Sequence, residues 1–107
     1  MNVQINYFQS NNLNNSLNLK VSRYSGVNNI LIDFGVNVIN KAYSLFHDFN
    51  DRAGYISDSF NSTFPDKSEI SKKWHCLIIP NGGGYQLYSS SLILYSTTKE
   101  NVLIFEK

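Results

Sequence analysis

The fold is indicated most clearly by the stretch Lys73-Trp74-His75-Cys76-Leu77-Ile78-Ile79-Pro80-Asn81-Gly82-Gly83-Gly84-Tyr85. A β-type run is broken there by a proline and three glycines, and three more short β-type runs begin at Tyr85. Short runs separated by turn residues predict a small antiparallel sheet and not a catalytic loop. The expected strands of this sheet are residues 74–79, 85–88, 92–98 and 102–105.

The chain before this sheet predicts one further strand and two helices. Residues 19–23 alternate between apolar and polar side chains, as in a half-buried strand. Three- and four-residue apolar steps then predict a helix over residues 27–48, although Gly35 costs it about 1 kcal/mol relative to alanine. We expect a second helix to begin at Asn50 or Asp51 and to end at Pro65. The predicted class is therefore α+β, with two helices packed on an antiparallel sheet.

The length of 107 residues supports a single domain. Residues 1–18 contain seven asparagines, a composition that bonds its own backbone locally, so we expect a flexible N-terminal extension. Within it, residues 3–8 alternate well enough to add a strand to a sheet edge. The folded domain is expected to span residues 19–107.

Composition weighs against several classes of protein. The formal charge is +1 and no basic run is longer than Lys72-Lys73, whereas nucleic-acid binding needs clustered cations. The longest apolar stretches are far shorter than the roughly 20 residues of a membrane helix. The N-terminus lacks the pattern of a secretory signal, and the single cysteine agrees with a cytoplasmic protein.

Catalytic and metal-binding patterns are weak. His75 and Cys76 are neighbours in a predicted strand, so their side chains point to opposite faces and cannot form a dyad. A zinc site needs three or four ligands, and the chain offers one cysteine with His47 and His75 at no paired spacing. The triple glycine precedes no helix that could bind phosphate. We expect no enzyme, no metal and no cofactor.

The predicted strand at residues 85–88 has glycines before it and serines after it. Nothing next to it in the sequence packs it tightly, so it either pairs with another chain or is prone to aggregate. An ordinary hairpin strand within one sheet is an equally compatible reading of the pattern.

Two neighbouring motifs, Trp74-His75-Cys76 and Asn81-x-Gly83-x-Tyr85, resemble the dynein light chains of the LC8 type. The similarity covers residues 19–107 and includes the order of the elements. It implies a homodimer in which one strand crosses to the partner's sheet, and a groove that binds extended peptides of dynein intermediate chain or other partners by β-strand addition. It also implies a cytoplasmic location on the cytoskeleton, with a microtubule-associated or axonemal dynein.

The resemblance also implies which residues form the sites. The peptide-binding groove would be formed by Asn81, Gly83, Gly84, Tyr85, Gln86, Leu87, Tyr88 and Arg52. The dimer interface would contain His75, Tyr85, Leu87 and Tyr95. The sequence departs from the family at Gly82 and Gly84, and Arg52 stands in for a displaced acidic-basic pair. These departures leave an alternative open, a purely structural subunit of a motor complex whose groove is lost or filled.

Overall fold

The computed structural model describes residues 15–66 and 72–107. In chain order the elements are β1 (Lys20–Ser25), α2 (Asn29–Leu45), α3 (Phe49–Thr63), β2 (Trp74–Pro80), β3 (Ser91–Ser96) and β4 (Glu100–Glu106). Both predicted helices are present, and so are four of the predicted strands. The strand expected at residues 3–8 lies outside the described residues.

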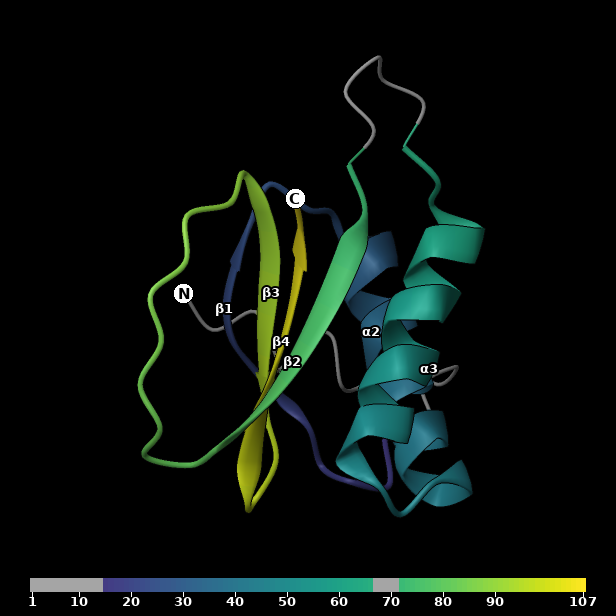
Figure 1. Ribbon diagram of the computed structural model, residues 1–107, viewed down its shortest axis with the longest axis vertical. Helices are drawn as coiled ribbons and strands as arrows, with labels where there is room; N and C mark the ends of the chain where they lie inside the picture. The colour runs from purple at the N-terminus through teal and green to yellow at the C-terminus, as the bar shows by residue number, and fades with distance from the viewer. Residues whose placement is uncertain (1–14, 67–71) are drawn as a thin grey trace.

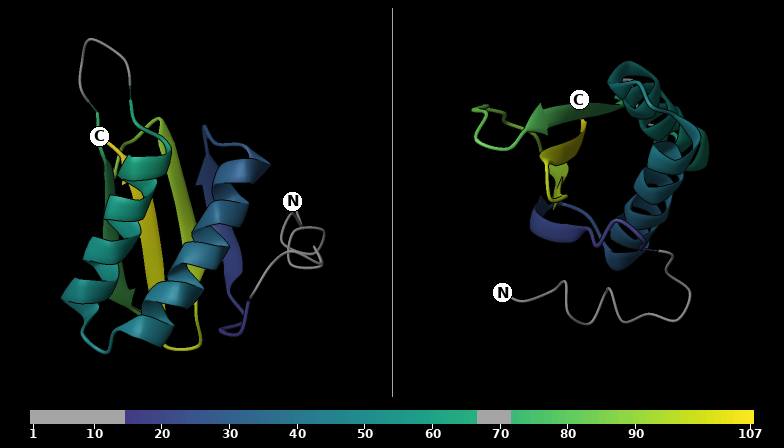
Figure 2. Two further views of the ribbon diagram at one scale, coloured as in Figure 1. Left: turned by 90° about the vertical axis from the view of Figure 1, so that its right-hand side faces the viewer. Right: turned by 90° about the horizontal axis from the view of Figure 1, so that it is seen from below.

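The strands form one antiparallel sheet in the order β1-β3-β4-β2. Both helices pack on the same face of this sheet, which leaves the other face without a helical layer (Figures 1 and 2). The predicted α+β fold, with two helices on an antiparallel sheet, is confirmed. We refer to the sheet face turned away from the helices as the outer face.

Each helix begins at a side-chain cap. Asn28 accepts a bond from the Leu31 N–H at 3.1 Å, and Asp48 accepts one from the Asp51 N–H at 3.1 Å. Phe46 has extended backbone dihedrals, and α2 ends at Leu45, three residues earlier than the sequence predicts. The second helix accordingly begins after Asp48, and not after Asn50 or Asp51, because Asp48 supplies the oxygen that the first-turn N–H groups need.

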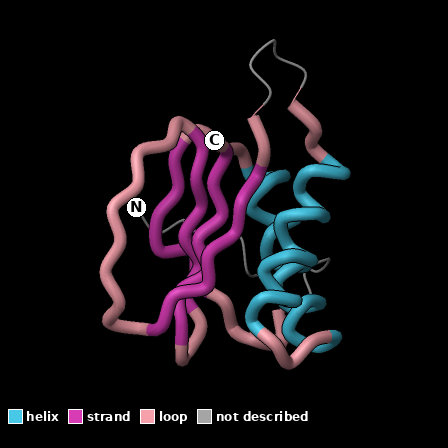
Figure 3. The backbone as a smooth tube through the Cα atoms, in the orientation of Figure 1, coloured by secondary structure: helices cyan, strands magenta, loops and turns pink. Residues whose placement is uncertain are grey.

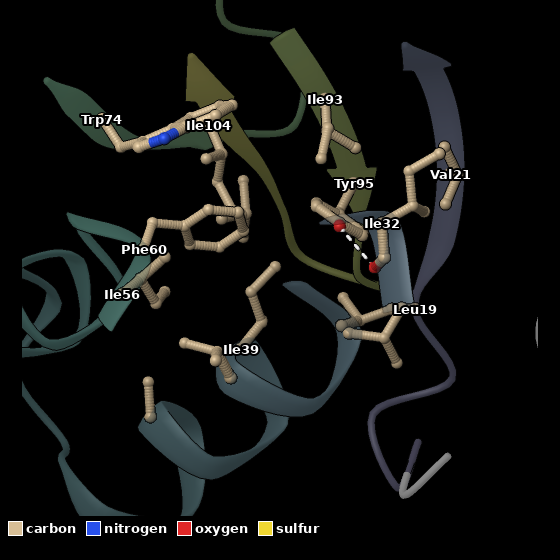
Figure 4. Close-up of a cluster of buried hydrophobic side chains, with 14 residues drawn as sticks. Leu19, Val21, Ile32, Ile39, Ile56, Phe60, Trp74, Ile93, Tyr95 and Ile104 are labelled. Carbon is tan, nitrogen blue, oxygen red and sulfur yellow. Dashed lines mark hydrogen bonds between the residues drawn. The ribbon is translucent and has the colours of Figure 1, made fainter. Parts of the chain in front are cut away.

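The core lies between the helices and the inner face of the sheet (Figure 4). The Phe60 ring of α3 packs 5.0 Å from Phe34 of α2 and 5.3 Å from Trp74 of β2, measured between ring centroids. These contacts connect both helices to the edge strand β2. Aromatic pairs of this kind contribute about 0.5–1.5 kcal/mol beyond the area that they bury.

Residues 15–18 are ordered, contrary to the expectation of a flexible extension up to residue 18. Asn40 of α2 is 4% exposed, and its side-chain oxygen accepts bonds from the Leu17 N–H at 2.8 Å and the Ser16 hydroxyl at 3.2 Å. Its amide nitrogen donates to Asn15 Oδ1 at 3.1 Å. The sequence composition missed this anchor because the partner lies more than 20 positions away.

The predicted strand at residues 85–88 is not a strand in the single chain, which is drawn there as a loop in Figure 3. The reading as an ordinary hairpin strand is also wrong, because β2 and β3 are not neighbours. Strand β4 lies between them, so residues 85–88 are not a hairpin strand between β2 and β3, and they pair with none of the described strands.

Candidate functional site

The connection from β2 to β3 contains an extended stretch that we call the arm, residues 84–88. Figure 1 shows it apart from the sheet, on the side away from the helices. Tyr88 is 82% exposed. Within the part of the chain that the structure describes, no backbone group of the arm has a hydrogen-bond partner. The arm therefore presents an extended backbone whose N–H and C=O groups are available to another chain.

The start of the connection is held by the β3–β4 turn. The Asn81 N–H donates to the Lys99 carbonyl at 3.1 Å, and the Asn81 side chain donates to the Thr98 carbonyl at 3.1 Å. The Gly83 N–H donates to the Pro80 carbonyl at 3.0 Å. Asn81, predicted to line the groove, is therefore a structural anchor of the arm in the single chain.

The end of the connection is held by two serines. The Ser89 hydroxyl bonds the Glu106 carbonyl at 2.7 Å, and the Ser91 hydroxyl donates to the Gly26 carbonyl at 3.2 Å. Gly26 has a φ of 64°, and a β-carbon there would clash with the Ser90 carbonyl oxygen. The connection is thus hydrogen-bonded on both sides of the arm, whereas the described residues offer the arm's own backbone no hydrogen bond.

The arm has two faces. Gln86 Nε2 donates to the Tyr88 hydroxyl at 2.8 Å, as expected for side chains two apart on one side of an extended chain. Leu87 lies on the opposite side and packs against the outer-face cluster of Leu92, Leu103 and Phe105. Leu87, and by alternation Tyr85, therefore belong to the side that faces the sheet.

Strand β2 has an open edge. Lys73 and Lys107 exchange both backbone hydrogen bonds, at 3.1 and 2.9 Å. Because bonding alternates along an antiparallel pair, the N–H and C=O groups of Cys76 and Ile78 point away from β4. No described residue bonds these four groups. Edge groups of this kind accept an added strand.

Asn61 of α3 closes this edge at its beginning. Its side-chain oxygen accepts the Trp74 N–H at 2.7 Å, and its amide nitrogen donates to the Trp74 carbonyl at 3.0 Å. One amide thereby replaces the backbone of a neighbouring strand at Trp74. The sequence prediction missed Asn61, because a polar residue next to Phe60 on a predicted helix gives no sign that it contacts a strand 13 positions later.

Two of the predicted dimer residues occupy different environments. The His75 ring stacks on Phe105 with a centroid distance of 5.3 Å and lies exposed on the outer face, beside Leu77. Tyr95 lies on the helix-facing side, is 0% exposed and donates its hydroxyl hydrogen to the Ile32 carbonyl at 2.7 Å. The prediction that Tyr95 contacts a partner subunit is wrong, because its side chain is enclosed by its own chain.

Arg52 is held by its own chain. Its Nε donates to the Phe46 carbonyl at 2.8 Å, and its guanidinium carbon lies 4.0 Å from the ring centroid of Tyr43. The Tyr43 hydroxyl donates to Glu100 at 2.8 Å. Burial raises the pKa of Tyr43 well above its ordinary value, and the hydrogen bond to Glu100 raises it further. Arg52 thus stabilises the turn between α2 and α3, a role that the sequence did not indicate.

The glycines of the loop differ in what they permit. A β-carbon at Gly83 would lie 2.8 Å from the Ile79 side chain, so the chain itself requires a glycine there. Gly82 has a φ of 86°, a backbone conformation that favours glycine. At Gly84 a β-carbon would meet nothing within 4 Å. Of the two glycines predicted to give a peptide room, Gly84 is the one that borders open space.

Other kinds of site have little support among residues 15–66 and 72–107. No group of three or more metal-ligating side chains occurs there, and no helix is long and apolar enough to cross a membrane. Burial raises the pKa of the Cys76 thiol to about 12, so this side chain is a poor nucleophile at neutral pH.

No known family model or curated protein matches the chain. The geometry of the arm and the β2 edge, together with the sequence motifs, is therefore what indicates a function.

Proposed function

We propose that this chain is a non-catalytic, homodimeric peptide-binding module, a divergent relative of the dynein light chains. The observation that supports this proposal is the arm, an extended segment whose backbone groups are unpaired among the described residues, in a connection that is hydrogen-bonded on both sides of it. Exposed, unpaired strands are an aggregation hazard unless a partner covers them. A second copy of the chain offers the matching surface, because its β2 edge is open at Cys76 and Ile78.

In the proposed dimer each arm pairs with the β2 edge of the other subunit. One edge of the arm is then used, and the other remains free for an extended peptide. Backbone hydrogen bonds would supply affinity, and the alternating side chains would supply specificity. Two such grooves related by a two-fold axis would bind a paired partner with an avidity gain of roughly 10² to 10⁴.

The partners expected for this module are the extended segments of dynein intermediate chain or of other dimeric proteins. This places its proposed location in the cytoplasm, on microtubule-associated or axonemal dynein. The motifs Trp74-His75-Cys76 and Asn81-x-Gly83-x-Tyr85 support this assignment, and so does the agreement in element order.

Light scattering at micromolar concentration tests the dimer. The expected mass is that of two chains, and a mass of one chain would overturn the proposal. A library of immobilised extended peptides then tests the groove. Retained peptides should compete with one another, because they use the same free edge of the arm.

The second candidate is a structural subunit of a motor complex without a working groove. The engagement of Arg52 with Phe46 and Tyr43 favours it, because Arg52 is then not free to read a peptide side chain. Such a subunit would have the mass of a dimer and retain no peptide from the library. The two candidates therefore agree in the first experiment and differ in the second.

A further inference from the structure

We propose that Asn61 fixes the register of the exchanged arm, so that Leu87 of one subunit lies opposite Leu77 of the other. The inference rests on the proposed strand exchange and adds the alignment of the two strands. Register has to be specified, because a slip of one residue moves every side chain to the opposite face of the sheet. A slip of two residues keeps the faces and is prevented only by local contacts.

The open edge of β2 is short. Asn61 occupies both edge-facing backbone groups of Trp74. At the other end, Pro80 has no N–H, and its carbonyl accepts the Gly83 N–H. The edge that remains consists of Cys76 and Ile78, which offer two donors and two acceptors.

The two sides of the arm limit how it can pair with this edge. Cys76 and Ile78 point their side chains to the helix-facing side, where both contact the core. In an antiparallel pair, residues opposite each other project to the same side. Gln86 and Tyr88 share one side of the arm, and Leu87 lies on the other side, against the outer face. Leu87 therefore lies on the same side as Leu77, and the even-numbered arm residues bond the edge.

The alignments that keep these sides differ from one another by slips of two residues. Gln86 opposite Ile78 with Tyr88 opposite Cys76 uses the whole open edge. A slip of two in one direction sets Tyr88 opposite Trp74, whose backbone groups are already bonded by Asn61. A slip in the other direction requires Ser90 opposite Cys76, and the Ser90 backbone is packed against Gly26. Only the first alignment gives the backbones of both Gln86 and Tyr88 free partners on the edge and leaves Ser90 in place against Gly26.

This register also decides which edge of the arm a peptide would meet. With Gln86 and Tyr88 bonded to the β2 edge, the N–H and C=O groups of Tyr85 and Leu87 point outward. A guest strand would therefore bond Tyr85 and Leu87. Leu77, which is 46% exposed in the single chain, would be covered by the partner's Leu87.

Disulfide trapping between two separately tagged chains tests the register, with Cys76→Ser in both chains. Leu77→Cys in one chain and Leu87→Cys in the other would form a pair without mutual hydrogen bonds, with Cα atoms about 4.5 Å apart, which suits a disulfide. The control combines His75→Cys with Leu87→Cys and reports the register slipped by two. We expect the first pair to yield at least tenfold more covalent heterodimer than the control.

Replacing Asn61 with alanine frees the Trp74 backbone and should raise the yield of the control pair severalfold. Equal yields from the two pairs, a larger yield from the control, or no covalent product from a protein with the mass of two chains would overturn the register. A mass of one chain together with no product would instead overturn the strand exchange itself. If Asn61→Ala does not fold, the comparison of the two pairs in the protein with Asn61 still decides the register.

Discussion

At the scale of single residues, Gly35 shows how a position that is unfavourable locally becomes necessary. Glycine weakens a helix interior, yet a β-carbon at Gly35 would clash with the Tyr95 hydroxyl. That hydroxyl donates to the Ile32 carbonyl (Figure 4), and the missing side chain of Gly35 leaves room for it. The missing side chain therefore allows α2 to lie close to β3.

Gly35→Ala should lower the free energy of unfolding by about 1–3 kcal/mol, because overpacking at Tyr95 outweighs the gain in helix propensity. Gly54→Ala is the matched control, since a β-carbon at Gly54 of α3 meets nothing within 4 Å. It should raise the same free energy by about 0.5–1 kcal/mol. Urea unfolding of both variants checks this, and effects of equal sign would contradict the packing argument.

The reactivity of Cys76 follows from its burial. With a pKa of about 12, the thiol stays protonated at pH 8 and offers almost no thiolate. Ellman's reagent should react with Cys76 at least about 100-fold more slowly than with an exposed cysteine, introduced as Lys99→Cys in a Cys76→Ser chain. In urea the two rates should converge. A fast reaction of native Cys76 would show that the β2 edge opens readily.

At the scale of elements, the segment before β1 is fixed by α2 and not by its own sequence. Asn40 bonds the Leu17 N–H, the Ser16 hydroxyl and the Asn15 side chain, and it also donates to the Val36 carbonyl. Asn15 in turn bonds the backbone N–H of Leu19 at 2.9 Å. These bonds join the entry of β1 to the middle of α2.

Asn40→Ala should lower the free energy of unfolding by about 2–3 kcal/mol, because it leaves buried donors and acceptors without partners. Asn50→Ala, an exposed position in the first turn of α3, should change it by less than about 0.5 kcal/mol. Thermal and urea unfolding of the two variants provide the comparison. Similar values for both would mean that the buried network adds little to stability.

At the scale of the whole molecule, the helices cover one face of the sheet and leave the other to the arm. Leu87 reaches the outer-face cluster, whereas Leu77 on the same face stays half exposed. Covering Leu77 with a second subunit would bury apolar surface at a gain of about 25 cal/mol per Å². This asymmetry between the two faces is the physical basis of the proposed dimer.

Leu77→Glu should weaken the dimer at least about 100-fold, because it places a carboxylate in an apolar interface. Ile30→Glu is the control, since Ile30 is a 67% exposed aliphatic residue on α2, at a distance from the outer face. Sedimentation equilibrium should find two chains for the control and one chain for Leu77→Glu. Loss of the dimer in both variants would point to a different interface.

The type and order of most elements can be predicted from the residue pattern along the chain. Apolar periodicity predicted both helices, and apolar-polar alternation predicted β1, because these patterns report which side of an element is buried. Short β-type runs separated by turn residues predicted β2, β3 and β4. The pattern also marked residues 85–88 as an extended segment without a local partner. It could not say whether that segment pairs within its own chain.

The strand order and the contacts that follow from it appear only in the folded chain. Because β4 lies between β2 and β3, residues 85–88 become an arm instead of a hairpin strand. Three such contacts join residues that are far apart in sequence. Asn61 bonds Trp74, Asn40 bonds Leu17, and the Tyr95 hydroxyl bonds Ile32. Periodicity describes one element at a time, so contacts between elements appear only when the chain is folded.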